Sequence, residues 1–326
     1  MSRYARQLAV PGMDQAKQDR LRAGSVLIVG AGGLAAPVLQ YLAAAGVGHL
    51  RLVDPDRVEL SNLHRQTLFR RSDLGQPKAV AAARALEGLN EDCRIEPLIM
   101  SLSPGSIAAL TRGVTLVLDC ADSFAVSYML SDHCLEAGLP FISASVVGTD
   151  GSAGGFCGGA PSLRAVFPDL PQRLGSCAED GVLGPVVGVI GGFQAQMALA
   201  VLAGLTPSPL GRMLTYDGLA QRAGGFSFIG AAEPAWRPRF IDASAIAPRD
   251  FVVDLRAPSE GPIAHPDARR LTVDRFGPDG PRPAAGQRAV FCCRSGQRAW
   301  TAAERLSAVW DGEIALIALG EQSPSD

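Results

Sequence analysis

VLIVGAGGLAAPVLQYLAAAGVGHLRLVD, residues 26–54, is the stretch that decides the fold of this chain. A short apolar run (25–29) ends in a group of glycines, a longer apolar stretch (34–46) follows, and a second short run (50–54) closes the segment. Short apolar runs are typical of buried parallel strands, and the longer stretch between them has the apolar spacing of a helix. The segment therefore predicts a strand–helix–strand unit of a doubly wound α/β sheet.

Three glycines stand where the first strand turns into the helix, namely Gly30, Gly32 and Gly33. Glycine lets the backbone approach a phosphate closely, and the start of a helix offers unpaired N–H groups and a positive dipole end. Asp54 closes the second strand, where an acidic residue binds ribose hydroxyls in nucleotide-binding proteins. The pattern predicts a bound nucleotide, and up to this point an NAD-dependent dehydrogenase fits it as well as an enzyme that uses ATP.

The segment after the second strand, DPDRVELSNLHRQTLF (54–69), separates these two classes of enzyme. Together with GQPK (75–78), it holds a cluster of polar and charged residues: Asp54, Asp56, Asn62, Arg65, Gln66 and Lys78. Hydride transfer needs no such cluster. A polyphosphate does, because Arg65 and Lys78 can bind phosphate oxygens and neutralise the charge that develops on a leaving pyrophosphate. The cluster therefore favours ATP.

The same alternation of strands and helices continues to about residue 220. Apolar runs at 114–119 and 140–147 predict further strands, and PKAVAAARALEGL (77–89) predicts a helix. From about residue 221 the composition changes to Gly, Ala, Pro and Arg without clear periodicity, which predicts a linker that partly packs on its neighbour.

A second, shorter alternation follows the linker. Apolar runs at 251–256, 287–293 and 313–319 predict strands, and a helix is expected from about residue 298 to 310. We therefore predict three parts: a nucleotide-binding domain (1–222), a linker (223–239) and a small α/β domain (240–326).

Composition narrows the class of protein. The chain has 326 residues, a net charge of −2 and an apolar content of 47%, which argues against a general nucleic-acid binder. Its seven cysteines form no CxxC pair, so a reducing compartment is expected. The N-terminal MSRYARQLAV has no apolar signal core, and the uncharged run 181–211 is broken by glycines and carries two glutamines, which favours a buried loop and helix over a membrane span. We expect a soluble cytoplasmic protein.

Five motifs together resemble the MoeB/ThiF (HesA) family, which is related to the ubiquitin-activating enzymes. They are RYARQ (3–7), GAGGL (30–34), DPDRVELSNLHRQ (54–66), GQPK (75–78) and DCADS (119–123). The resemblance covers residues 3 to about 220. It implies a homodimeric enzyme with a Rossmann-like ATP-binding domain, which uses ATP and Mg²⁺ to adenylate the C-terminal glycine of a ubiquitin-like sulfur-carrier protein ending in Gly-Gly.

The resemblance also implies roles for individual residues. The expected ATP contacts are Gly30, Gly32 and Gly33 at the phosphates, Asp54 at the ribose, and Asn62, Arg65 and Lys78 along the triphosphate, with Asp56 and Gln66 as further contacts. Asp122 would hold Mg²⁺ and help to orient the attacking carboxylate. Arg6 matches an arginine that reaches the ATP of the partner subunit, which implies a homodimer.

The chain departs from the family pattern in three places. Ala35 stands at the last glycine of GxGGxG, which would move the helix slightly away from the strand. Ser162 and Ala165 stand where many relatives have the first of two zinc-binding CxxC pairs, and the second pair is absent from 221–240, so we expect no structural zinc. The glycine-rich 148–162 is also unusual in the loop that contacts the carrier.

Two cysteines are candidates for sulfur chemistry. Cys177 lies in a polar, glycine-flanked segment, where a cysteine of sulfur-transferring relatives joins the carrier or resolves a persulfide. Cys293, in FCCRSGQR (291–298), is expected just after a strand, in a loop whose N–H groups, helix dipole and arginines would lower the thiol pKa. Cys292 is expected to be the buried end of that strand.

The region around Cys293 resembles a rhodanese domain, whose loop cysteine carries a persulfide. The resemblance rests on VVDLRAPSE (252–260), IAHPDAR (263–269) and VFCCRSGQRAW (290–300), within about 240 to 320. The chain ends soon after LIALGEQ, so we expect the last helix of that fold to be reduced.

The two resemblances together predict adenylation of the carrier followed by sulfur transfer from a Cys293 persulfide to give a thiocarboxylate. The sulfur donor would be a cysteine desulfurase or thiosulfate. Two alternatives stay open: adenylation alone with the second domain as a docking module, and a non-catalytic ATP-binding scaffold for a ubiquitin-like partner. The pathway, whether molybdopterin, thiamin, tRNA thiolation or a specialised metabolite, is also open. A dehydrogenase is disfavoured because no hydride site accompanies the glycines.

Overall fold

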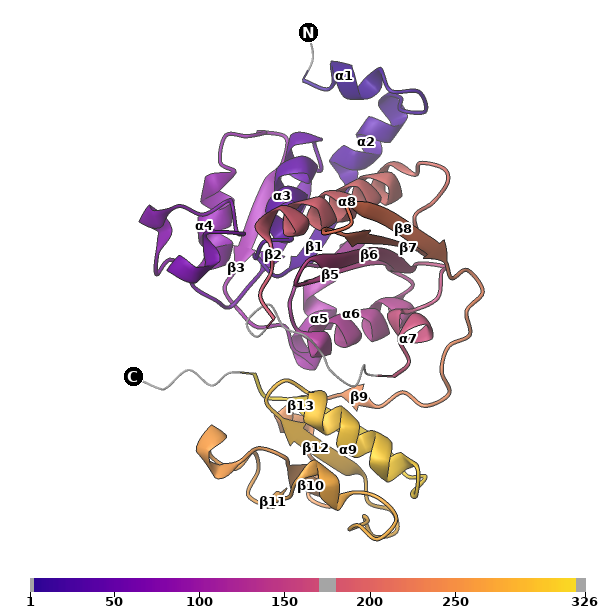
Figure 1. Cartoon of the computed structure of the whole chain (residues 1–326). Coiled ribbons are helices and arrows are strands. Elements are labelled where there is room, and N and C mark those ends of the chain that lie inside the picture. Colours follow the sequence, from indigo (N-terminus) through magenta and orange to yellow (C-terminus); the bar gives the residue numbers. More distant parts are fainter. Residues whose placement is uncertain (1–2, 170–179, 321–326) are drawn as a thin grey trace.

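The computed structural model describes residues 3–169 and 180–320, which form two units, each built on its own sheet (Figure 1). In the first sheet the strand order is β3-β2-β1-β4-β5-β6-β7-β8, with β1 to β5 parallel and the last three antiparallel. Its strands are β1 (Ser25–Val29), β2 (His49–Val53), β3 (Arg94–Leu98), β4 (Leu116–Asp119), β5 (Pro140–Val147), β6 (Asp150–Cys157), β7 (Arg212–Asp217) and β8 (Arg222–Ser227). The doubly wound α/β fold is confirmed.

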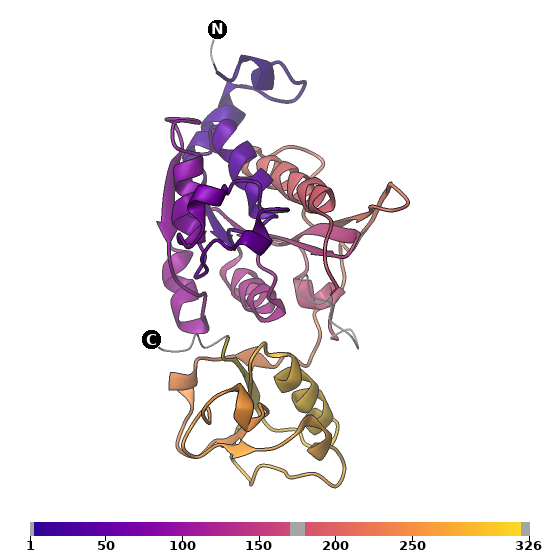
Figure 2. The same cartoon turned by 60° about the vertical axis from the view of Figure 1, so that its left-hand side comes forward.

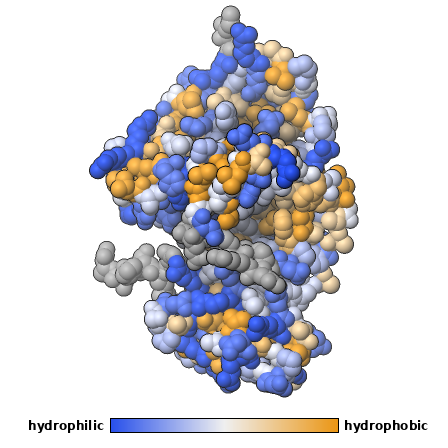
Figure 3. Space-filling view, viewed as in Figure 1, coloured by the Kyte–Doolittle hydropathy of each residue, from blue (hydrophilic) through white to orange (hydrophobic). Residues whose placement is uncertain are grey.

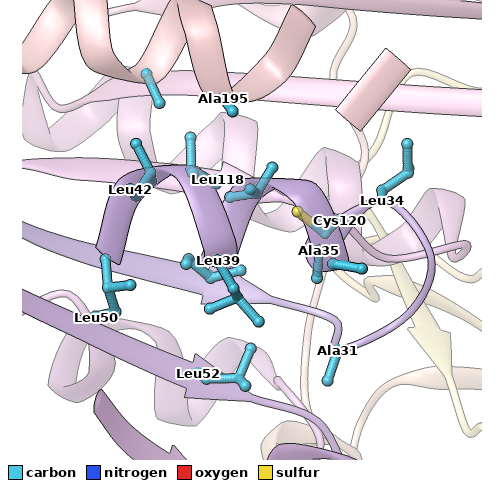
Figure 4. Packing of buried hydrophobic residues seen from close by; sticks show 14 of the residues in the cluster. Ala31, Leu34, Ala35, Leu39, Leu42, Leu50, Leu52, Leu118, Cys120 and Ala195 are labelled. Atoms are coloured by element: carbon cyan, nitrogen blue, oxygen red, sulfur yellow. The ribbon is translucent and has the colours of Figure 1, made fainter. Parts of the chain in front are cut away.

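Helices cover both faces of the parallel part of this sheet. On one face α3 (Ala35–Ala44) packs against α8 (Gly184–Ala203), and α2 (Gln15–Ala23) and α4 (Lys78–Ala85) belong to the same apolar core. Figure 4 shows side chains of α3, such as Leu39 and Leu42, between the sheet and α8. The other face carries α5 (Pro104–Leu110) and α6 (Phe124–Ala137), and two short helices are α1 (Ala5–Leu8) and α7 (Leu163–Val166).

Most sequence-predicted elements of the first unit agree with the structure, and two differ. The predicted helix 77–89 ends earlier, at Ala85, and Gly88 adopts a left-handed backbone with φ of +76° in the turn that follows. The predicted linker 223–239 is wrong at its start, because residues 222–227 form β8 at the edge of the sheet. This strand escaped prediction because it is exposed along its whole length and so lacks an apolar run.

The second unit has a five-stranded parallel sheet in the order β11-β10-β12-β13-β9. Its elements are β9 (Arg239–Phe240), β10 (Phe251–Asp254), β11 (Arg269–Arg270), β12 (Ala289–Cys293), α9 (Gln297–Ser307) and β13 (Ile314–Ala318). Both views show this unit beneath α6 of the first unit (Figures 1 and 2). Buried residues from α6, α9 and the strands beside them form one apolar cluster, so the two units share part of their core.

Among the described residues, α8 is long and apolar enough to cross a membrane by length and composition. Its Ile190 and Ala198 are fully buried, and the helix packs against α3, β5 and β6. It is therefore a core helix of the first unit, as the sequence predicted for 181–211. Figure 3 shows hydrophilic and hydrophobic residues interspersed over both units, with hydrophobic residues gathering where β7 and β8 lie.

Candidate active site

The glycine loop lies against the end of the neighbouring strand β4. A Cβ at Gly30 would be 2.6 Å from the carbonyl oxygen of Cys120, and Gly30 has a φ of +95°, so no other residue fits there. A Cβ at Gly33 would be 2.7 Å from a methyl group of Val187. At Gly32 the nearest atom would be the amide nitrogen of Gln66 at 3.7 Å, an ordinary van der Waals contact. Packing thus requires glycine at Gly30 and Gly33 but not at Gly32.

Asp54 ties the glycine loop to the end of β2. Its Oδ2 accepts a hydrogen bond from the N–H of Ala31 at 2.7 Å, and its Oδ1 accepts one from the N–H of Asp56 at 2.8 Å. The side chain is buried, and burial raises its pKa, while the two N–H groups and Lys78 oppose that rise. Asp54 therefore acts first as the anchor of the loop that would hold phosphate.

Lys78 begins α4 with its ammonium group mostly buried. Its Nζ forms an ion pair with Oδ2 of Asp56 at 2.9 Å, and the Asp56 side chain is 62% exposed. A buried cation whose partner is exposed is placed to exchange that carboxylate for a phosphate oxygen. The sequence brought these two residues together correctly.

The end of the segment 60–66 lies against the glycine loop, because Gln66 is near Gly32 and the Arg65 carbonyl is near Gly33. Asn62 is buried and its Oδ1 accepts the N–H of Glu59 at 3.1 Å, so its side chain shapes the turn. Arg65 donates to the carbonyl of Ser61 at 3.1 Å. Gln66 is buried, its amide nitrogen is the group nearest Gly32, and its Oε1 has no hydrogen-bond partner among the described residues. An unpaired buried acceptor beside this loop fits a nucleotide whose ribose hydroxyls or base N–H groups supply the missing donor.

The end of β4 is organised by residues that sequence reasoning missed. Asp119 is fully buried; its Oδ2 accepts the hydroxyl of Ser143 at 2.8 Å, and its Oδ1 accepts the N–H of Ala121 at 3.1 Å. Burial raises the pKa of Asp119 to about 6. Gln194 of α8 donates to the Asp119 carbonyl at 2.7 Å. Gln194 did stand out in an apolar run, but only as a sign against a membrane span.

Asp122 and Arg6 occupy very different positions relative to this loop. Asp122 is exposed and lies just before α6, beyond the Cys120 backbone that contacts Gly30. Arg6 lies on α1, which Figure 1 shows beyond α2, at the end of the first unit where β1 begins. The glycine loop lies at the opposite end of β1. The structure therefore does not bring Arg6 to the loop of its own chain, and its predicted reach into a partner subunit stays a prediction.

Cys293 is the last residue of β12, fully buried together with Cys292. Its Sγ accepts N–H groups from Gly296 at 3.1 Å and Ala299 at 3.4 Å, so the expected cradle around the sulfur is present. The expected lowering of its pKa is wrong: burial raises the pKa of Cys293, and the N–H groups and Arg298 only partly offset it. Desolvation of the thiolate outweighs the favourable dipoles.

Arg298 forms an ion pair with Glu260 of the same unit. Its guanidinium donates to Glu260 at 2.8 and 2.5 Å and to the Leu255 carbonyl at 3.0 Å. Cys177 lies outside the described residues, so its predicted role stays a prediction. Within the described ranges no group of three or more His, Cys, Asp and Glu residues could hold a metal ion.

Ser162, which stands at the first of the two absent CxxC pairs, forms hydrogen bonds with a carboxylate. Its hydroxyl donates to Glu233 at 2.6 Å and its N–H donates to the same carboxylate at 2.7 Å. Its Oγ also accepts the N–H of Ala165 at 3.3 Å. The segment after β8 is thus fastened to α7 by hydrogen bonds.

The doubly wound sheet, the glycine loop and the buried cation define an α/β nucleotide-binding protein. A family model makes the class specific: it matches residues 4–234, and the chain belongs to the ThiF family.

Relatives with curated names extend this result. The chain is 44% identical over 257 residues to "Adenylyltransferase and sulfurtransferase MOCS3" of Bos taurus, covering 78% of this chain and 55% of that protein. It is 39% identical over 227 residues to "Sulfur carrier protein adenylyltransferase" of Thermus thermophilus, covering 67% of this chain and 84% of that protein. The chain spans about half the length of the MOCS3 relatives it matches.

Solved structures support the fold. The crystal structure of E. coli MccB with ATP aligns with a TM-score of 0.63 at 20% identity, covering 70% of this chain and 72% of that one. At this identity the likeness concerns the fold alone.

Proposed function

We propose that this chain adenylates the C-terminal glycine of a ubiquitin-like sulfur carrier with ATP and then transfers sulfur to it from Cys293. One observation carries the proposal: the loop after Cys293 lies against Phe124, which follows by four residues Cys120, whose backbone contacts Gly30 of the glycine loop. The names of the MOCS3 relatives, which pair the same two activities, support it.

In the first step the carrier's terminal carboxylate attacks the α-phosphorus of ATP, an acyl-phosphate bond forms, and pyrophosphate leaves. A carboxylate is a weak nucleophile and its target is anionic, so catalysis depends on positioning and charge neutralisation. Gly32 would admit the phosphates to the loop, and the unpaired Oε1 of Gln66 would accept a hydrogen bond from a ribose hydroxyl of the nucleotide. Lys78 and Arg65 would bind the triphosphate and the leaving pyrophosphate.

Mg²⁺ fits this proposal through Asp122, an exposed carboxylate two residues after Cys120, whose backbone contacts Gly30. The ion would neutralise charge on the phosphates. Asp122 would also orient the carrier's carboxylate toward ATP.

In the second step the outer sulfur of a Cys293 persulfide attacks the acyl carbon, and AMP leaves. This gives an acyl disulfide between the carrier and Cys293. The Cys177 thiolate would then attack the Cys293 sulfur, so that the carrier leaves as a thiocarboxylate and a Cys177–Cys293 disulfide forms. A thiol reductant must reduce that disulfide before the next turnover. The persulfide itself would come from a cysteine desulfurase or from thiosulfate, which releases sulfite.

The second unit would be a rhodanese-like domain, and the active form a cytoplasmic homodimer in which Arg6 reaches the partner's ATP.

Exposed Phe226 and Ile229 flank the open edge of β8, beside a hollow of about 470 Å³ lined by residues such as Thr215 and Arg222. An open strand edge with apolar neighbours is a surface that a folded partner can cover. We propose this side of the first unit as the place where the carrier's globular part docks.

The test is ATP–pyrophosphate exchange with a panel of small ubiquitin-like proteins that end in Gly-Gly. Exchange that depends on one carrier is expected, and Lys78→Ala should lower its rate by roughly 100-fold or more because the pyrophosphate loses its buried cation. Lys17→Ala is the matched control, since Lys17 pairs with Asp14 at 3.2 Å on the surface. ATP binding without exchange across the panel would favour the scaffold alternative.

A second candidate function is adenylation alone, with the second unit as a docking module. The complete burial of Cys293 and its raised pKa favour this candidate. Incubation with thiosulfate or a loaded cysteine desulfurase separates the two: a persulfide on Cys293, read by mass spectrometry, supports sulfur transfer, and an unmodified Cys293 supports docking alone.

A further inference from the structure

Arg164 joins the two units of the chain. Its Nε and Nη2 donate to the carboxylate of Asp132 on α6 at 2.6 and 2.8 Å, and Nη2 also donates to the carbonyl of Pro238 at 3.0 Å. The same guanidinium lies 4.9 Å from the ring centre of Tyr128, on α6, and 4.9 Å from that of Trp300, on α9. The Arg164 side chain is 1% exposed. One buried cation is therefore bound at once by the first unit, the connecting segment and the second unit.

The loop after Cys293 contacts the first unit at a second point. A Cβ at Gly296 would lie 3.2 Å from a ring atom of Phe124 and 2.8 Å from one of Phe240. Phe124 opens α6, two residues after Asp122. The glycine whose N–H binds the Cys293 sulfur is thus enclosed by Phe240 of its own unit and by Phe124 at the start of α6, and no part of Cys293 reaches the surface.

These non-covalent contacts can hold the second unit on α6 reversibly. Interfaces between units of one chain resemble transient protein–protein interfaces. Removing Arg164 would leave Asp132 and the Pro238 carbonyl without their donor, so the interface would lose its buried ion pair.

We propose that Arg164 is a positioning residue that locks the second unit onto α6, so that the Cys293 loop serves the nucleotide site of its own chain. In the locked state the sulfur is closed off from solvent beside the Asp122 segment. Release from α6 exposes Cys293, whose thiolate then attacks the outer sulfur of a donor persulfide while the donor's thiolate leaves. The sulfur step rests on the proposed function; the lock itself does not.

The lock is tested by the rate at which a bulky thiol reagent modifies Cys293. The full chain carries Cys177→Ala and Cys93→Ala, and peptide mapping identifies the modified residue. Arg164→Leu and Phe124→Ala should each raise the rate by roughly 10-fold or more, because the cover over Gly296 is loosened. Arg84→Leu is the matched control, since Arg84, on α4 of the first unit, pairs with Asp73 at 2.6 Å.

Circular dichroism reports whether each variant is folded. Should Arg164→Leu not fold, Arg164→Lys keeps the charge but loses the two-point pairing, and the same rise is expected from it. A folded variant of Arg164 whose Cys293 reacts at the parent rate would overturn the lock.

Transfer within one chain is tested by mixing Cys293→Ala, which adenylates, with Lys78→Ala, which keeps its sulfur loop. No thiocarboxylate above that of either variant alone is expected, and restored product would overturn transfer within one chain. Arg164→Leu should keep carrier-dependent exchange within about twofold while its thiocarboxylate yield falls roughly 10-fold, because an untethered loop loses its high effective concentration. An unchanged yield would contradict the positioning role, whereas absence of exchange in the unsubstituted chain would contradict the proposed function only.

Discussion

Asp119 ends β4 with a carboxyl group that no solvent reaches, beside Ser143 and the N–H of Ala121. Burial raises its pKa to about 6, above the ordinary value of 3.8, so the folded chain holds this proton more tightly than the unfolded chain does. The contribution of Asp119 to the free energy of unfolding is therefore fully present below about pH 4, and it is lost as the pH rises through 6.

Asp119→Asn removes this dependence on pH. Relative to the parent, the variant should gain up to about 3 kcal/mol of stability between pH 4 and pH 7, because an amide has no charge to bury. Urea unfolding at a series of pH values measures the difference in free energy of unfolding between the variant and the parent. A difference that stays constant from pH 4 to pH 7 would contradict the assignment.

For single residues, the sequence identified which residues lie near the glycine loop better than it identified what each of them contacts. Gly30 and Gly33 were expected at the phosphates, yet their first requirement is the close approach of Cys120 and Val187. Asp54 was expected at a ribose, yet both its oxygens bind backbone N–H groups. Such packing comes from segments distant in sequence, which a local pattern does not report.

Elements with an apolar run were predictable and elements without one were not. β1 and β5 begin and end where the apolar runs do, because parallel strands covered by helices must be apolar. β8 is held by β7 on one side only and is exposed throughout, so its composition reads as a linker.

The segment after β8 is held by Glu233, and this contact can be measured. Glu233→Ala leaves the hydroxyl and N–H of the fully buried Ser162 without their acceptor, which should cost about 1–3 kcal/mol in the free energy of unfolding. Glu91→Ala, an exposed acid, is the control and should change stability by less than about 0.5 kcal/mol. Equal stability of the two variants would show that the hydrogen bonds to Ser162 do not fasten this segment.

At the scale of the whole molecule, the sequence predicted two units but not how they meet. The contact depends on aromatic side chains from both units, Phe124 and Tyr128 with Phe240 and Trp300, packed edge to face at 5.0 to 5.8 Å. Each of these residues is also an ordinary core candidate, so nothing in the sequence marks it as part of an interface. The joint position of the Cys293 loop and the Asp122 segment emerges only when the units are assembled.

The central claim is that Cys293 delivers sulfur to a carboxylate activated at the nucleotide site. The most direct measurement is single-turnover formation of carrier thiocarboxylate by Cys293→Ala and by Cys292→Ala, with a carrier that supports exchange and with thiosulfate or a cysteine desulfurase as donor. We predict that both variants keep ATP–pyrophosphate exchange, that Cys292→Ala forms thiocarboxylate, and that Cys293→Ala forms none. Thiocarboxylate formed by Cys293→Ala at the parent rate would contradict the account.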